Sequence, residues 1–257
     1  VAADRREAAA AIEAALAGPE VSAFALVDGD AVVPLGLAQD SKRVGEGDTG
    51  PNTGGMGAYS PLPWLSAADE ERIWDVVSDT VRALEKDGVA YRGLLYTGLM
   101  LTDEGPKVLE YNCRFGDPKT EALVPRLGAR LAPLLVACAT GTLRGVASEP
   151  ADGAAVTVVL ASGGYPGAHE TGREIRGLEE AATVPDSVVF HAGTAERDGR
   201  VVTAGGRVLA ATGWGPSLAD ARARAYEAAS AISFDGMIGR GDIAAGAAEA
   251  ERGEGAR

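Results

Sequence analysis

The chain has 257 residues, of which 46% are hydrophobic and 24% charged, and its formal net charge is −13. This length and composition exclude the disordered class and allow a sizeable core in one large domain or two ordinary ones. The acidic charge argues against nucleic-acid or membrane-surface partners, because both are negatively charged. Without an apolar run of about 18 residues and with only two cysteines, we expect a cytoplasmic protein without a disulfide framework.

Hairpins and helices alternate in the first half of the chain. Pro34 places its strand at a sheet edge or a bulge, and Ser66 caps an amphipathic helix that stops before Gly88. In chain order we predict a helix over 4–16, a hairpin of 21–27 with 31–37, a loop over 45–61, the Ser66 helix, a hairpin of 94–101 with 107–112, and a helix over 120–140.

The second half begins after a small, polar stretch at 147–153, which predicts a domain boundary. Short strands are expected at 155–161, 188–191, 201–202 and 207–212, followed by a helix that Ser217 caps. We therefore divide the chain into domains 1–147 and 148–238, with a disordered tail at 239–257. The pattern favours an α+β fold over a doubly wound parallel one.

The strand ending at residue 114 carries the residues that best fit metal chemistry. Side chains alternate along a strand, so Glu110, Asn112 and Arg114 share one face, and Tyr111 and Cys113 point to the other. Carboxylate and amide oxygens suit Mg²⁺ or Mn²⁺, and a guanidinium suits a phosphate oxygen. The alternative is a solvated strand face with a Glu–Arg ion pair.

Two further segments are candidates for a site. Asp117 follows in a Gly-Asp-Pro turn, which by itself is usually only a turn. Six glycines fall within 45–61, and glycine lets backbone N–H groups converge on an anion, although the alternative is a flexible surface loop. Lys42 and Arg43 precede this loop and are either part of an anion site or ordinary surface cations.

Three segments together resemble the phosphoribosylamine–glycine ligases of the ATP-grasp superfamily. They are Gln-Asp-Ser-Lys-Arg at 39–43, Gly-Pro-Asn-Thr-Gly-Gly-Met-Gly-Ala-Tyr-Ser-Pro at 50–61, and Glu-Tyr-Asn-Cys-Arg-Phe-Gly-Asp-Pro at 110–118. The stretches 163–167, 190–194 and 203–209 resemble the C-terminal domain of the same family. The resemblance implies the second half of an ATP-grasp domain, an antiparallel sheet with helices, followed by a small C-terminal α/β domain.

The resemblance also implies the chemistry. ATP would phosphorylate glycine, and the amine of 5-phosphoribosylamine would attack the glycyl phosphate to give glycinamide ribonucleotide, ADP and phosphate, a step of purine biosynthesis. Glu110 and Asn112 would hold Mg²⁺ or Mn²⁺, Arg114 and Asp117 would be catalytic, and Glu20 would bind the ATP ribose. The acceptor side would be lined by Asp40, Lys42, Arg43, Asn52, Thr53, Gly54 and Gly55. The partners would be these small molecules, and we expect a monomer.

The sequence also departs from the family pattern. Lys119 and Glu121 stand where the family usually has Glu and Gln. The family's N-terminal domain and first ATP-grasp half would precede residue 1, and the resemblance skips a strand and hinge between Leu16 and Gly18. These departures keep open an alternative, a non-catalytic ATP-grasp remnant that acts as a binding module.

Overall fold

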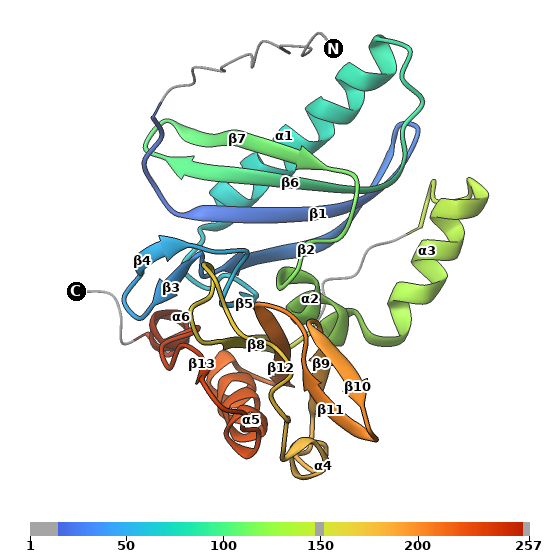
Figure 1. Cartoon of the computed structure of the whole chain (residues 1–257). Helices are drawn as coiled ribbons and strands as arrows, with labels where there is room; N and C mark the ends of the chain where they lie inside the picture. The colour runs from blue at the N-terminus through green and yellow to red at the C-terminus, as the bar shows by residue number, and fades with distance from the viewer. Residues whose placement is uncertain (1–14, 147–151, 254–257) are drawn as a thin grey trace, which may run out of the picture.

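The computed structural model describes residues 15–146 and 152–253, and within them every strand pair is antiparallel (Figure 1). The helices are α1 (Ala67–Lys86), α2 (Lys119–Leu127), α3 (Leu131–Thr140), α4 (Leu178–Ala181), α5 (Leu218–Ala231) and α6 (Ala245–Glu251). The strands are β1 (Glu20–Asp28), β2 (Ala31–Asp40), β3 (Arg43–Gly45), β4 (Thr49–Asn52), β5 (Gly57–Ser60), β6 (Arg92–Thr102), β7 (Gly105–Asn112), β8 (Ala154–Ser162), β9 (Ser187–His191), β10 (Thr194–Arg197), β11 (Arg200–Thr203), β12 (Arg207–Gly215) and β13 (Met237–Ile238).

One sheet runs through both parts of the chain in the order β7-β6-β1-β2-β5-β8-β12-β9, with β13 beside β8. The short strand β5 joins the two parts. It pairs with β2 at Gln39 and Asp40, and its other edge pairs with β8 from Gly57 to Ser60. The expected loop over 45–61 is therefore wrong in detail, because β5 and the β3–β4 hairpin lie within or beside it.

Local signals placed the main elements correctly. The two predicted hairpins are β1–β2 and β6–β7, and the bulge predicted from Pro34 lies where the β1–β2 register shifts between Phe24 and Ala25. Ser66 caps α1, its side chain accepting a hydrogen bond from the Asp69 amide. The α+β antiparallel architecture is confirmed.

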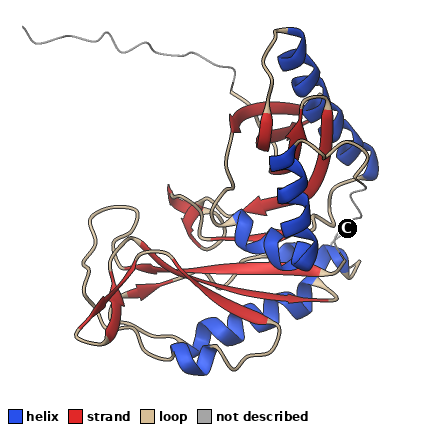
Figure 2. Ribbon diagram, turned by 90° about the vertical axis from the view of Figure 1, so that its right-hand side faces the viewer, coloured by secondary structure: helices blue, strands red, loops and turns tan. Residues whose placement is uncertain are grey.

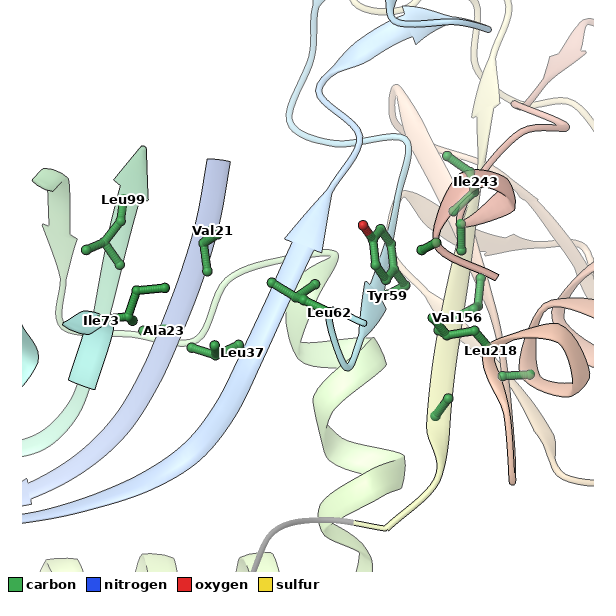
Figure 3. Close-up of a cluster of buried hydrophobic side chains, with 14 of the residues drawn as sticks. Val21, Ala23, Leu37, Tyr59, Leu62, Ile73, Leu99, Val156, Leu218 and Ile243 are labelled. Atoms are coloured by element: carbon green, nitrogen blue, oxygen red, sulfur yellow. The ribbon is translucent and has the colours of Figure 1, made fainter. Parts of the chain in front are cut away.

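The largest hydrophobic cluster crosses the junction between the two parts. Figure 3 shows Val21, Leu37 and Leu99 on one side of β5 and Val156, Leu218 and Ile243 on the other. A second cluster lies under α2 and α3, and a third between α5 and the strands β8 and β12. Figure 2 shows the two parts of the sheet with α1 and α5 packed against them. The joined sheet and shared core fix the first part relative to the second.

The helix predicted over 120–140 is two helices, because Pro125 lies within α2 and Gly128 adopts a φ of +52° before a 3-10 turn at Gly128–Arg130. By length and composition 119–140 is apolar enough to cross a membrane, but here Leu123 and Leu134 are buried in the second cluster.

The tail expected to be disordered from 239 is ordered through 253. Ile243, Ala247 and Ala248 are buried in the largest cluster, and α6 spans Ala245–Glu251. Small side chains allow this close packing without the large apolar residues that normally mark a core helix. The expected helix over 4–16 and the boundary at 147–148 lie in or against residues 1–14 and 147–151, outside the described residues.

Candidate active site

Glu110 projects from the end of β7 over the face of the sheet. Its partner on β6 is Gly98, where a Cβ atom would stand 3.2 Å from the Glu110 Cγ, so glycine leaves room for the carboxylate side chain. Tyr111 points to the opposite face, where its hydroxyl lies 2.7 Å from Thr80 Oγ1 on α1. The predicted alternation along this strand is therefore present at Glu110 and Tyr111.

A hollow of about 220 Å³ gathers three residues that the sequence placed in separate segments. Glu20 begins β1, Lys42 follows β2, and Glu110 lies near the end of β7. These strands are brought together because β1 lies between β2 and β6 in the sheet. The other lining residues are Val21, Ser22, Tyr96, Gly98, Leu99 and Leu109.

The side-chain oxygens of Glu110 and Asn112 are available as metal ligands. Within the described residues, neither side chain has a hydrogen bond or an ion pair, and the alternative Glu110–Arg114 ion pair is not formed. The Arg114 guanidinium donates instead to the Phe115 carbonyl, at 2.9 Å. One carboxylate and one amide oxygen fit Mg²⁺ or Mn²⁺, which take few protein ligands and complete their shell with phosphate and water.

Asp40 lies between two lysine side chains. Its Oδ2 is 2.8 Å from Lys42 Nζ and 3.1 Å from Lys119 Nζ. The Asp40 and Lys119 side chains are only 2% and 5% exposed, whereas Lys42 is 33% exposed and faces the hollow. The Lys119 ammonium also lies 5.4 Å from the Tyr96 ring centroid, in a cation–π arrangement.

The two lysines respond differently to this shared carboxylate. Burial lowers the pKa of Lys119, and Asp40 offsets only part of that effect. Burial also opposes the charged form of Lys42, but Asp40 outweighs it and raises the pKa of Lys42. Lys119 departs from the family residue, and it is a buried partner of Asp40 rather than a group open to a ligand. Lys42 is the cation of this cluster that reaches the hollow.

The amides of residues 53–56 are already bonded. Thr53 donates to the Lys42 carbonyl, Gly54 to the Tyr165 hydroxyl, Gly55 to Thr53 Oγ1, and Met56 to the Ser41 carbonyl. The expected convergence of backbone N–H groups on an anion is therefore wrong for 53–56. These residues form a rigid support beside the 117–118 turn.

The remaining predicted residues divide into two groups. Gly55 packs against the turn, since a Cβ there would stand 2.5 Å from Pro118 Cδ. Arg43 and Asn52 are exposed and pair across the β3–β4 hairpin, and Arg43 Nη1 donates to the Gly50 carbonyl at 2.9 Å. Neither of these two lines the hollow described above.

Sequence reasoning missed two residues that reach the site from the second part of the chain. Arg207 Nη1 lies 2.9 Å from Asp117 Oδ1 and donates to the Gly54 carbonyl at 3.0 Å. The Tyr165 hydroxyl accepts from the Gly54 amide at 3.0 Å. Both lie in segments that carry the family resemblance, 163–167 and 203–209, but nothing local in those segments indicates a contact with Gly54.

Glu121 is a half-buried acid on α2. Its Oε2 is buried without a hydrogen-bond partner. Burial, together with the nearby Asp117 carboxylate, raises the pKa of Glu121 to about 7. The side chain therefore changes charge near neutral pH beside the 117–118 turn.

The antiparallel sheet and the hollow at its strand ends agree with the comparisons to known proteins. Residues 5–120 match the family described as "Phosphoribosylglycinamide synthetase, ATP-grasp (A) domain", and residues 155–246 match "Phosphoribosylglycinamide synthetase, C domain". The fold is that of the ATP-grasp class of ATP-dependent ligases. Within that class, the chain belongs to the phosphoribosylamine–glycine ligase family, which confirms the resemblance predicted from its motifs.

Individual relatives give the same result. The chain is 49% identical to the phosphoribosylamine–glycine ligase of Rhizobium meliloti, over 90% of this chain and 55% of that protein. It is 51% identical to the enzyme of the same name from Streptomyces coelicolor, over 93% and 58%. The chain therefore spans somewhat more than half the length of these relatives.

Solved structures extend the comparison to the fold. The crystal structure of phosphoribosylamine–glycine ligase from Thermotoga maritima superposes with a TM-score of 0.77 at 44% identity, covering 89% of this chain and 56% of that one. A biotin carboxylase domain from Hydrogenobacter thermophilus superposes with a TM-score of 0.62 at 15% identity, covering 86% of this chain and 47% of that one. The second match shows the shared fold alone.

Proposed function

We propose that the protein carrying this chain ligates glycine to 5-phosphoribosylamine with ATP, through glycyl phosphate. The products are glycinamide ribonucleotide, ADP and phosphate. The observation that carries the proposal is the hollow where Glu20, Lys42 and Glu110 meet, with unengaged oxygens on Glu110 and Asn112. Membership of the ligase family supports the reaction, and the net charge of −13 argues for small-molecule partners over nucleic acid. The proposal includes a monomeric, cytoplasmic enzyme.

In this proposal, each residue has a role that fits its position. Glu20 binds the ribose hydroxyls of ATP, and Lys42, the half-exposed cation of the hollow, binds its phosphate oxygens. Glu110 and Asn112 hold Mg²⁺ or Mn²⁺, which neutralises phosphate charge when bound. Arg114, whose guanidinium is exposed at the end of β7, stabilises charge on the phosphoryl group in transfer.

The reaction has two halves. A glycine carboxylate oxygen attacks the γ-phosphorus of ATP, and the bond to the ADP oxygen breaks. The phosphoribosylamine nitrogen then attacks the glycyl carbonyl carbon, the bond from that carbon to the phosphate oxygen breaks, and the nitrogen gives its extra proton to the released phosphate. Asp117, whose side chain is 47% exposed, presents its carboxylate to a substrate amine. The rigid support at 53–56, with Asp40 behind it, lines the acceptor side.

A second candidate is a non-catalytic ATP-grasp remnant that binds nucleotide without turnover. Lys119 favours this alternative, since it puts a buried cation against Asp40 where the family usually has an acid. The unengaged Glu110 and Asn112 pair favours the enzyme, because a binding module has no need of two free metal-ligating oxygens at a strand end.

Turnover in the purified complete protein separates the two candidates. ADP release and formation of glycinamide ribonucleotide are measured with ATP, glycine and phosphoribosylamine, and with each omitted in turn. We expect product only with all three present, and a loss of at least 100-fold in Glu110→Gln. Glu104→Gln, on the exposed β6–β7 turn, is the matched control. Nucleotide binding without product in the unmodified protein would establish the remnant instead.

A further inference from the structure

The contact of Arg207 with the first part of the chain joins the two segments that flank the proposed acceptor side. Arg207 begins β12 in the second part. Its Nη1 pairs with Asp117 Oδ1 at 2.9 Å and donates to the carbonyls of Gly54 at 3.0 Å and Asp117 at 3.3 Å. One guanidinium therefore holds the glycine-rich segment and the Gly-Asp-Pro turn in a fixed relation.

Tyr165 completes this contact from the same part. Its hydroxyl accepts from the Gly54 amide, so both the N–H and the C=O of Gly54 bond to residues of the second part. Two glycines mark close packing around this contact. A Cβ on Gly54 would stand 3.1 Å from Arg207 Cζ, so the first part approaches the guanidinium closely. Within the second part, a Cβ on Gly206 would stand 2.4 Å from Tyr165 Cδ2, which leaves no room for a larger side chain beside Tyr165.

Arg207 also acts electrostatically on two acids. It pairs with Asp117, and it lowers the pKa of Glu121, which burial otherwise raises. Its side chain is 23% exposed, so water competes only weakly with these bonds. Arg207 does not line the hollow that holds Glu20, Lys42 and Glu110.

We propose that Arg207 is a positioning residue for the ligation, because it holds Asp117 and the Gly54 segment in fixed positions relative to each other. The second part of the chain thereby sets the geometry of the acceptor side. This inference rests on the proposed function for the reaction, but the positioning itself is a structural claim. Loss of Arg207 frees the Asp117 carboxylate and the Gly54 carbonyl together, while the nucleotide hollow keeps all its lining residues.

Steady-state kinetics of the complete protein test the catalytic part. We expect Arg207→Met to lower kcat by about 10- to 100-fold, with KM for ATP changed less than about twofold, because misplacement near the reacting groups costs rate more than nucleotide binding. Arg207→Lys keeps a cation near Asp117 and should recover at least a third of the lost kcat on a logarithmic scale. Arg200→Met, an exposed arginine of β11 paired with Glu174, is the matched control and should change neither parameter.

Hydrogen exchange at the amides of 53–56 tests the positioning without turnover. Arg207→Met should speed exchange there by about tenfold or more, with the amides of β8 and β12 unchanged, and Arg200→Met should not. If exchange changes in this way but the unmodified protein makes no product, the positioning stands and the proposed function fails.

Three results would overturn the inference. One is unchanged exchange at 53–56 with kcat within twofold of the unmodified protein. Another is a loss of kcat in Arg207→Met that is matched by an equal rise in KM for ATP and by faster exchange throughout β8 and β12, since that pattern marks a residue needed only for folding. The third is a kcat in Arg207→Lys as low as in Arg207→Met.

Discussion

Asp40 and Lys119 form a buried ion pair, 3.1 Å between Oδ2 and Nζ, beside the Lys42 side chain that faces the hollow. Asp40 also pairs with Lys42, so one carboxylate balances two ammonium groups. Two ammonium groups share one carboxylate, so the cluster carries a net positive charge, and Lys42 is its member that faces the hollow. The pair thus links the electrostatics of the hollow to residue 119.

Replacing Asp40 should lower the free energy of unfolding more than replacing Lys119. Asp40→Asn leaves two ammonium groups without a counter-ion and should lower the free energy of unfolding by about 3–5 kcal/mol. Lys119→Met leaves the Asp40–Lys42 pair in place and should change it by less than about 1.5 kcal/mol. Urea denaturation followed by circular dichroism measures both.

The double variant is the control for that comparison. Asp40→Asn with Lys119→Met removes the buried cation as well, and should regain part of the stability lost in Asp40→Asn alone. Equal destabilisation by the two single variants, with no recovery in the double variant, would show that Lys119 and Asp40 do not depend on each other.

Glu121 predicts a pH dependence of stability. Its pKa rises from an ordinary 4.5 to about 7 in the folded chain, so between these pH values the folded state holds a proton that the unfolded state has lost. The free energy of unfolding therefore falls as the pH rises from about 4.5 to about 7, and the total loss from Glu121 is about 1–3 kcal/mol. Below about pH 4.5 both states hold the proton and nothing is lost. Glu121→Gln should remove this slope and be the more stable form at pH 8.

The measurement is the free energy of unfolding at intervals from pH 5 to pH 8. Glu227→Gln, on the exposed face of α5, is the matched control and should follow the unmodified protein. A Glu121→Gln profile parallel to that of the unmodified protein would mean that Glu121 is already ionised at pH 5.

The β5 junction predicts a steric effect. A Cβ on Gly57 would lie 2.6 Å from the Thr157 carbonyl oxygen and 2.8 Å from Ile243 Cγ2, so Gly57→Ala must push β5 away from β8. We expect a loss of about 1–3 kcal/mol in thermal or urea unfolding. Gly246→Ala, in α6 with open space around it, should instead gain up to about 1 kcal/mol. A neutral Gly57→Ala would mean that the junction is loosely packed.

Much of the fold follows from local patterns in the sequence. The Asp-Gly turn, the Ser66 cap and the Pro34 bulge each depend on neighbouring residues, and the structure has all three. β5 was missed because its pairing comes from β2 and β8, on both sides, while its glycine-rich surroundings indicate a loop. α6 was missed because alanines, rather than large apolar residues, fill its buried face.

Local patterns in the sequence likewise predict one part of the site and miss the other. The face predicted for Glu110 follows from the period of a single strand, and its position beside Lys42 follows once β1, β2 and β6 are neighbours. The contact of Arg207 with Gly54 joins residues 153 positions apart, and no local pattern encodes it. The hydrogen bonds that occupy the amides of residues 53, 54 and 56 likewise come from the Tyr165 hydroxyl and the carbonyls of residues 41 and 42, which no local pattern indicates.

We propose that Glu110 and Asn112 form the metal end of the ATP site, and Mn²⁺ binding tests this proposal most directly. Free Mn²⁺ is measured by electron paramagnetic resonance during titration of the complete protein without ATP, because ATP itself chelates the ion, with Glu104→Gln as the control. We predict that Glu110→Gln and Asn112→Ala each weaken Mn²⁺ binding by about tenfold or more, as loss of a direct ligand requires. Binding by both variants as tight as in the unmodified protein would contradict the claim.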